Sequence, residues 1–142
     1  MTPSGATGSE GEKKSGKKAP LRGAELVAFS ATAKAAAAKA FYGETLGLPL
    51  ESEDPFAIVF DANGTTLRVA IVPKVVPAGY TILSWRVPDI VSVVARLSGA
   101  GVKFERYPGM DQDELGIWNS PSGARIAWFN DPDGNTLAVS QY

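Results

Sequence analysis

Residues 126–141 read IAWFNDPDGNTLAVSQ, and this segment is the strongest indication of the fold. It predicts a strand, a tight turn and a strand, because DPDGN is rich in turn-forming residues and β-branched or aromatic residues flank it. Asp131 and Asp133 are expected to shape the turn. Residues 61–70, DANGTTLRVA, match DPDGNTLAVS at residues 131–140 in the Asp, Gly, Thr, Leu and Val positions. A hairpin that occurs twice predicts a structural module that occurs twice.

The residues before each hairpin predict the same order of elements in both halves. In the first half the pattern favours a strand at residues 25–30, a helix at 33–46 and strands at 48–52, 56–61 and 65–72. In the second half it favours a strand at 80–87, a helix at 90–100, a strand at 102–106 and the final hairpin. The sequence therefore predicts an α+β fold of two paired βαβββ modules, at about residues 25–73 and 80–142.

Apolar spacing also predicts which side of each helix is buried. For the first helix the expected buried side consists of Ala36, Ala40, Phe41 and Leu46, with Tyr42 beside them. For the second helix it consists of Ile90, Val93, Val94 and Leu97. Gly47 and Gly101 follow the two helices, as glycine commonly does at helix C-termini.

Composition excludes several classes of function. A chain of 142 residues is expected to form one domain, or two small modules with a shared core. Neither cysteine nor histidine is present, which removes disulfides, thiolate nucleophiles, thiolate metal sites and the serine–histidine pairing of many hydrolases. No apolar run approaches a membrane span and the N-terminus lacks the apolar core of a signal peptide. These features favour a cytoplasmic location.

The net charge of −1 is unevenly distributed along the chain. Residues 1–22 carry five basic and two acidic groups, a net of +3, and almost no apolar side chains. We expect them to form a disordered Lys/Gly/Ser tail without an assigned function, ahead of a domain at residues 23–142. The remaining residues carry nine basic and thirteen acidic groups, a net of −4, so the domain has no electrostatic footprint for nucleic acid.

Four short motifs occur in a characteristic order: FYGETLGL at residues 41–48, VPDI at 87–90, GV at 101–102 and DPDGN at 131–135. Together they resemble the vicinal oxygen chelate superfamily, which includes glyoxalase I, bleomycin-resistance proteins and extradiol dioxygenases. The resemblance covers residues 25–142. It implies paired βαβββ modules whose sheets curve into a cleft, often in a homodimer. In the metal-dependent members it implies one divalent ion bound at four positions in that cleft.

The same resemblance places those four positions on Val27, Arg68, Ile82 and Ala138. The family's metal-dependent members carry His, Glu or Gln there. Valine, isoleucine and alanine side chains offer no nitrogen or oxygen ligand, and a guanidinium repels a cation. We therefore expect neither a metal ion nor another cofactor, and expect these residues to line an apolar cleft instead.

Other side chains are candidates for the same cleft. Arg68 is interpreted either as an anchor for an anion or carbonyl, or as the partner of an acidic side chain at the rim of the sheet. Ser84 and Arg86 share the cleft-facing side of their strand, with Arg86 nearer the strand end. Trp85 alternates away from them and is expected beneath a helix, whereas core and cleft positions remain open for Trp128.

The loop at residues 107–123 is long for a compact domain. One interpretation is a lid in which Trp118, Tyr107 and Met110 close over a ligand. The alternative is a solvated loop whose single hydrophobic anchor is Trp118.

The sequence thus favours a protein that binds a small organic molecule without a metal ion. The expected cleft residues are Val27, Arg68, Ile82, Ser84, Ala138 and Trp118. The resemblance to the bleomycin-resistance branch implies a ligand that is sequestered without being transformed. Two alternatives remain open: a metal-dependent lyase, isomerase or dioxygenase whose ligands the sequence does not reveal, and a dimerisation module without a ligand. The expected partners are a small molecule and a second copy of the chain, with no nucleic acid and no membrane.

Overall fold

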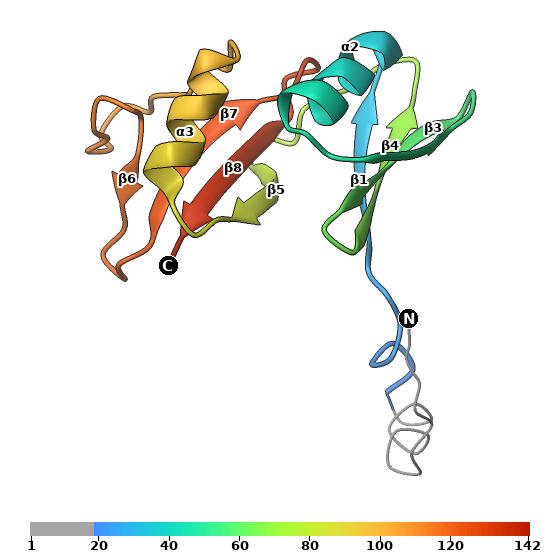
Figure 1. Ribbon diagram of the computed structural model, residues 1–142, viewed down its shortest axis with the longest axis horizontal. Helices are drawn as coiled ribbons and strands as arrows, with labels where there is room; N and C mark the ends of the chain where they lie inside the picture. Colours follow the sequence, from blue (N-terminus) through green and yellow to red (C-terminus); the bar gives the residue numbers. More distant parts are fainter. Residues whose placement is uncertain (1–18) are drawn as a thin grey trace.

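The computed structural model describes residues 19–142, so the disorder expected for residues 1–18 lies outside the described part of the chain. Two four-stranded sheets lie next to each other, each accompanied by helical segments (Figure 1). The described end of the predicted tail forms a turn, in which the Arg22 N–H donates to the Ala19 carbonyl at 3.0 Å. Among residues 19–142 no helix has the length and apolar character needed to cross a membrane.

The first module contains β1 (Val27–Thr32), α2 (Ala35–Ala40), η1 (Phe41–Thr45), β2 (Leu50–Glu53), β3 (Ala57–Ala62) and β4 (Thr65–Ile71). Its strands lie in the order β1-β4-β3-β2, with β1 parallel to β4. The continuous helix predicted at residues 33–46 is instead divided, because the turn η1 is π-helical. In this turn the Leu46 N–H donates to the Phe41 carbonyl five residues earlier, at 2.9 Å. Gly47 follows at φ +80°, which supports its predicted role at the helix end.

The predicted buried side of the first helix is partly wrong. Ala36 and Ala40 are exposed, whereas Ala38 and Tyr42 are fully buried. Ala38 and Tyr42 are four residues apart and therefore lie on one side of the helix. The hydroxyl of Tyr42 bonds to groups inside the protein, as described below, and this orients the helix differently from the apolar pattern alone.

The second module contains β5 (Thr81–Arg86), α3 (Ile90–Gly99), β6 (Trp118–Asn119), β7 (Arg125–Asn130) and β8 (Thr136–Gln141). Its strand order β5-β8-β7-β6 repeats that of the first module, with β5 parallel to β8. The strand predicted at residues 102–106 is wrong, since only a single bridge joins Phe104 to Phe129 there. The outer edge of β7 is shared between this bridge and β6, and β6 takes the place of the predicted strand.

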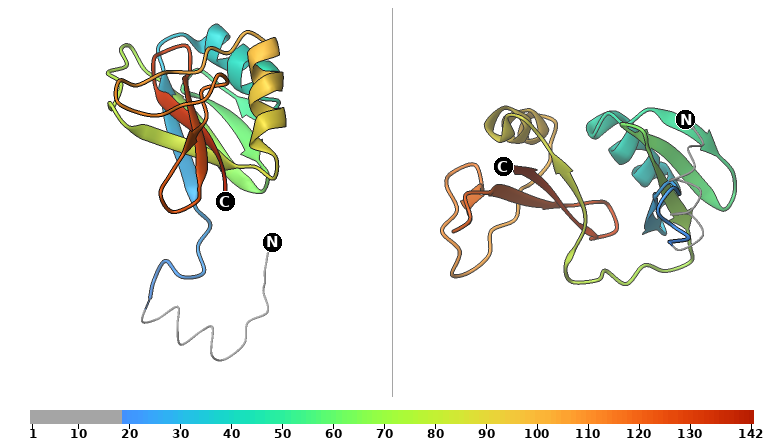
Figure 2. Two further views of the ribbon diagram at one scale, coloured as in Figure 1. Left: turned by 90° about the vertical axis from the view of Figure 1, so that its left-hand side faces the viewer. Right: turned by 90° about the horizontal axis from the view of Figure 1, so that it is seen from below.

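One hydrophobic core joins the helix-covered faces of both sheets. Its sheet residues include Ile58, Phe60, Leu67, Val69, Ala127, Phe129, Leu137 and Val139. The predicted face of α3 is confirmed, because Ile90 and Val94 are fully buried while Val93 and Leu97 pack partly buried against the core. Figure 2 shows α2 and α3 on the same side of the molecule, with the segment that connects the two sheets on the opposite side.

A buried hydrogen-bond network joins the two modules at the turn between β7 and β8. Asp131 is only 6% exposed, and its Oδ2 accepts from the Tyr42 hydroxyl at 2.7 Å and from Asn135 Nδ2 at 2.8 Å. Its Oδ1 accepts from the backbone N–H groups of Asp133 and Asn135, both at 2.9 Å. The Tyr42 hydroxyl also lies 3.2 Å from Ser30 Oγ. A side chain from η1 is thus bonded to the turn of the other module.

Further bonds attach the same turn to the end of β1. Asp133 accepts from the Thr32 hydroxyl at 2.5 Å and from the Ala33 N–H at 2.9 Å. Asn135 Nδ2 donates to the Ala31 carbonyl at 3.1 Å. The turn predicted from the DPDGN motif is present, and its two acids also hold the modules together.

We predict that Tyr42 makes stability decline at high pH. Burial, and then the nearby Asp131 carboxylate, raise the pKa of the Tyr42 hydroxyl above its ordinary value. In the unfolded chain this pKa is about 10, so above that pH the unfolded state releases a proton that the folded state keeps. The contribution of the Tyr42 hydroxyl to the free energy of unfolding is therefore fully present below pH ~10. Above that pH it falls by about 1.4 kcal/mol per pH unit.

The variant Tyr42→Phe should lower the free energy of unfolding by about 1–3 kcal/mol at pH ~8, because Asp131 loses a buried donor. The free energy of unfolding of this variant should also decline less steeply above pH ~10 than that of the wild type. Urea unfolding across this pH range measures both effects. Tyr80→Phe, which changes a tyrosine that is 69% exposed, is the matched control. Parallel pH profiles of wild type and Tyr42→Phe would contradict the assignment.

Candidate functional site

Each sheet has a face turned away from its helix, and we term these two surfaces the cleft faces. Side chains alternate between the faces of a strand, so the buried Leu67 and Val69 place Arg68 on the opposite side. The first cleft face includes Val27, Phe29, Val59, Asp61, Thr66 and Arg68. The second consists of Ser84, Trp118, Ile126, Trp128 and Ala138.

The first cleft face brings together two of the predicted residues, Val27 and Arg68. Strand pairing sets Phe29 and Val59 on either side of Arg68. Val27 lies two residues from Phe29 on the same strand. Val27 is 44% exposed and Phe29 is 58% exposed. Phe29 was not singled out from the sequence, because one phenylalanine in a predicted strand gives no sign of which face is uncovered.

The guanidinium of Arg68 has no ion pair or hydrogen bond within residues 19–142. The ion pair present in that part of the chain joins Lys39 to Glu53 at 2.6 Å, on the other side of the sheet. Asp61 is the acid on the same face of β3, and its carboxylate accepts from the Gly64 N–H at 2.7 Å. The half-buried Arg68 is therefore available to an anion.

The second cleft face brings together Ser84, Ala138 and Trp128, which are neighbours across β5, β8 and β7. Ala138 is only 2% exposed, so it forms the floor beneath larger neighbours. The indole Nε1 of Trp128 donates to Thr81 Oγ1 at 3.1 Å, which fixes the orientation of the ring. Trp118 pairs with Ile126 and lies on the same side as Trp128.

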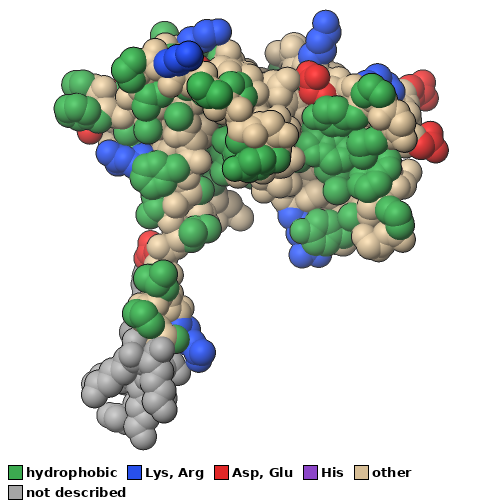
Figure 3. Space-filling model, turned by 180° about the vertical axis from the view of Figure 1, so that it is seen from behind, with side chains coloured by type: hydrophobic (Ala, Val, Ile, Leu, Met, Phe, Trp, Pro, Cys, Tyr) green, Lys and Arg blue, Asp and Glu red, His purple; other side chains and the backbone are tan. Residues whose placement is uncertain are grey.

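Three rings gather on this face, and we call Tyr107, Trp118 and Trp128 the aromatic cluster. The ring centroids of Trp118 and Trp128 are 6.0 Å apart, and those of Tyr107 and Trp128 are 5.5 Å apart. All three side chains are partly exposed. From the side opposite to Figure 1, hydrophobic side chains gather over the second module (Figure 3). Trp85 lies on the other face of the sheet beside Val93, as its alternation predicts.

The long loop before β6 is ordered by the amide of Gln112. Its Oε1 accepts from the Tyr107 N–H at 2.8 Å. Its Nε2 donates to the carbonyls of Glu105 and Gly116, at 2.9 and 2.8 Å. Burial, and then the nearby Glu105 carboxylate, raise the pKa of the Tyr107 hydroxyl. The loop thus places Tyr107 beside the tryptophans as a neutral ring.

A β-bulge interrupts the regular alternation of β5 at Ile82. The register of β5 against β8 shifts between Thr81 and Leu83, so simple alternation does not assign Ile82 to the second cleft face. Ile82 instead lines a groove of about 350 Å³ between β5 and the first module, together with Ser84 and Leu26. The remaining lining residues are Ala28, Ala62, Thr65, Leu67, Leu83 and Trp85.

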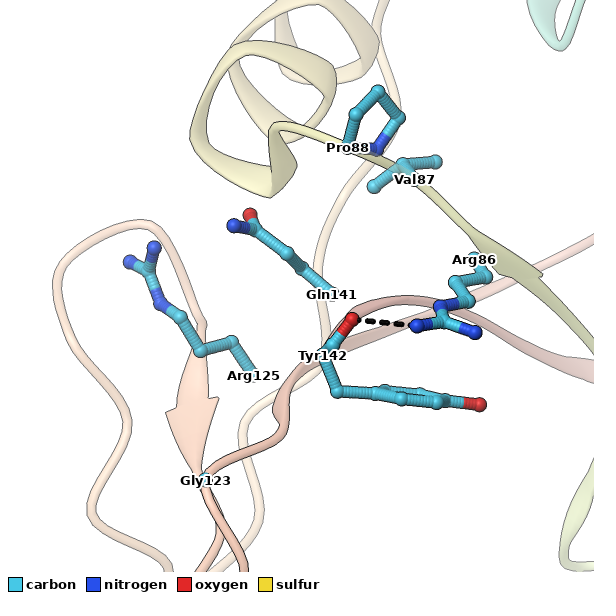
Figure 4. Close-up of a pocket in the computed structure, with 7 residues that line it drawn as sticks. All are labelled: Arg86, Val87, Pro88, Gly123, Arg125, Gln141 and Tyr142. Carbon is cyan, nitrogen blue, oxygen red and sulfur yellow. Dashed lines mark hydrogen bonds between the residues drawn. The ribbon is translucent and has the colours of Figure 1, made fainter.

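Arg86 takes part in a different pocket, at the far end of β5. Figure 4 shows its side chain stacked along the Tyr142 ring, with Arg125 and Gln141 on the other side of the pocket. Arg86 donates to the Tyr142 carbonyl at 2.8 Å, and its guanidinium carbon lies 4.4 Å from the ring centroid. This pocket of about 480 Å³ is also lined by Val87, Pro88 and Gly123. The second arginine candidate is therefore engaged away from the aromatic cluster.

The four residues that the sequence resemblance predicts at the metal positions do not fit a divalent ion. Val27, Ile82 and Ala138 carry no donor atom, and Arg68 is a cation. Within residues 19–142 no group of three or more His, Cys, Asp or Glu side chains is arranged to hold a metal ion.

With this geometry established, the comparisons give the family. The profile of the Glyoxalase/Bleomycin resistance protein/Dioxygenase superfamily matches residues 27–139, and the chain belongs to this family. The fold predicted from the repeated hairpin, two βαβββ modules, is confirmed. A comparison with curated protein sequences found no match.

Solved structures share this fold at low sequence identity. A bleomycin-binding protein complexed with bleomycin has a TM-score of 0.65 and 20% identity, covering 83% of this chain and 98% of its own. Lactoylglutathione lyase from Agrobacterium tumefaciens has a TM-score of 0.62 and 17% identity, and the match covers 82% of this chain and 92% of the lyase chain. TnmS3, an antibiotic binding protein from Streptomyces sp. CB03234, has a TM-score of 0.58 and 26% identity, covering 82% and 95%.

We predict that Gln112→Ala loosens the loop that carries Tyr107. Three hydrogen bonds of the Gln112 amide would be lost, so amide hydrogen exchange at residues 105–117 should become about tenfold faster or more. Exchange in β8 should stay unchanged. The control variant Glu114→Ala alters an exposed residue of the same loop. Equal exchange in both variants would show that Gln112 does not order the loop.

Proposed function

We propose that this protein binds a small organic molecule against its cleft faces without a metal ion. The observation that carries the proposal is the chemistry of the four residues that the sequence resemblance aligns with the metal positions: Val27, Ile82 and Ala138 offer no ligand, and Arg68 is cationic. Exposed apolar and aromatic side chains surround these positions, as in many small-molecule sites. In this proposal Val27 and Arg68 contact the ligand from one side, and Ser84, Trp118 and the floor at Ala138 from the other.

The packing within one chain supports a cleft completed by a second copy. The modules contact each other through their helix-covered sides, where the ring centroids of Phe41 and Phe129 are 6.2 Å apart. On the same side Leu46 and Trp85 line one small apolar cavity of about 150 Å³. The cleft faces point away from this contact. A second copy would place its first cleft face opposite the second cleft face of its neighbour.

The strand edges support the same arrangement. Within residues 19–142 β1 pairs only with β4, and β5 pairs only with β8, so each has a free edge in that part of the chain. Free edges are strong templates for pairing with another chain. Leu26, which is 75% exposed, lines the apolar groove between them. If β1 of each copy docks beside β5 of the other, the contact is self-complementary and closes as a homodimer with two equal clefts.

The named relatives support a binding role. Among the structural neighbours, one is a bleomycin-binding protein complexed with bleomycin and another is an antibiotic binding protein. A metal-dependent reaction would require donor groups at the cleft positions, and Val27, Arg68, Ile82 and Ala138 do not supply them. In this proposal the protein binds its ligand in the cytoplasm.

We predict that ligand binding is independent of metal. In a thermal-shift screen of small organic molecules, a ligand at about 100 times its dissociation constant should stabilise the protein by about 2.7 kcal/mol. The shift should be the same before and after treatment with a chelator. Stoichiometric metal in the purified protein, or loss of the shift after chelation, would favour the enzyme alternative. No shift with any compound would favour a dimerisation module.

We predict that Leu26→Asp weakens the homodimer. A carboxylate in the apolar groove would have to be desolvated when a second copy docks, so the dissociation constant should rise about tenfold or more. Light scattering during gel filtration should give twice the chain mass for the wild type. Leu21→Asp is the matched control, because Leu21 is 80% exposed and does not line the groove. A wild-type protein with the mass of one chain would contradict the proposed dimer.

A further inference from the structure

We infer that the ligand of this cleft is a planar aromatic molecule that carries an anionic group. The inference rests on the proposed function and adds the chemical class of the ligand. It comes from the aromatic cluster on one cleft face and the unpaired guanidinium on the other.

The aromatic cluster is a preformed surface for a flat ring. Trp118 and Trp128 are tilted by 37° to each other with centroids 6.0 Å apart, and Tyr107 meets Trp128 edge-on at 76°. The bond from Trp128 to Thr81 and the bonds of Gln112 hold these rings before a ligand arrives. Aromatic groups that are already ordered lose little entropy on binding, and flat ligands stack on them.

The first cleft face, which the proposed dimer would set opposite the aromatic cluster, carries a cation with apolar neighbours. Arg68 lies between Phe29 and Val59, and none of its guanidinium donors is used within residues 19–142. The one acid on the cleft faces of β1, β3 and β4 is Asp61, which already accepts the Gly64 N–H. A guanidinium binds a carboxylate or similar group through two parallel hydrogen bonds. Apolar neighbours strengthen that attraction by excluding water.

Charges on the second module orient the ligand. Burial, and then the nearby Glu105 carboxylate, raise the pKa of the Tyr107 hydroxyl, and this acid disfavours an anion at the loop end of the aromatic cluster. The anionic group should therefore point away from Tyr107, toward Arg68 of the second copy. Phe29 would then cover the ring of the ligand from the side opposite Trp118 and Trp128.

Three matched probes test the inference by isothermal titration of the wild-type protein. 2-Naphthoate is planar and anionic, 2-naphthamide is planar and neutral, and decahydro-2-naphthoate is anionic without a planar ring. We expect 2-naphthoate to bind about tenfold tighter than either of the other two, because each lacks one required feature. Equal affinity for 2-naphthoate and 2-naphthamide, or for 2-naphthoate and its saturated analogue, would overturn the inference.

Two variants assign the features to residues. Arg68→Gln should lower the affinity for 2-naphthoate about tenfold, because only the anion loses its partner. The affinity for 2-naphthamide should stay within about twofold of the wild-type value. Trp118→Leu should lower the affinity for both aromatic probes by about fivefold or more. The affinity for decahydro-2-naphthoate should stay within about twofold of the wild-type value. Arg96→Gln, which changes an exposed residue of α3, is the control and should match the wild type. Equal effects of Arg68→Gln and Arg96→Gln would overturn the role of Arg68.

Tryptophan fluorescence gives a second readout. Trp118 and Trp128 lie on the cleft face, whereas Trp85 lies beneath the helices, so 2-naphthoate should quench part of the emission and Trp118→Leu should reduce the quenched part. The two proposals fail differently. If other compounds shift the melting temperature but 2-naphthoate does not bind, the ligand class is wrong and the binding function stands. If no compound binds, both are wrong.

Discussion

The arrangement of the two modules depends on one buried carboxylate. Asp131 accepts four hydrogen bonds and has no cationic partner within residues 19–142. A charge at 6% exposure is costly unless hydrogen bonds replace its water, and here two come from backbone amides of its own turn. A third comes from the Tyr42 hydroxyl, 89 positions away. Moving the modules apart would break the bond from Tyr42 to Asp131 and the bonds that join the same turn to the end of β1, so the turn favours one relative position.

That position decides where a ligand can bind. With the helix-covered sides of the modules packed together, the opposite faces of both sheets remain at the surface, with free edges at β1 and β5. The first of these faces carries Val27 and Arg68, and the second carries Ser84, Ala138 and the aromatic cluster. Side chains on these faces can contact another molecule through apolar packing, aromatic stacking and one guanidinium group.

Local pattern predicted most of the fold, and its failures have physical causes. The repeated hairpin, the face of α3 and the inward position of Trp85 followed from alternation and from turn-forming residues. The first helix was misjudged because a π-turn and the bonds of Tyr42 set its orientation. The strand expected at residues 102–106 was replaced by β6, because β7 has one outer edge and two short segments share it. Local sequence does not show which of two distant segments will pair with the outer edge of β7.

Residue type and spacing along the chain are enough to predict the repeated modules and the turn at residues 131–135. The tertiary structure decided which side chains meet. It set Phe29 beside Arg68, gathered the aromatic cluster from a loop and two strands, and displaced Ile82 through a bulge. It also gave Asp131 a role beyond its turn. Alternation states which side of a strand a residue occupies, but strand register and the docking of one module on another select its neighbours.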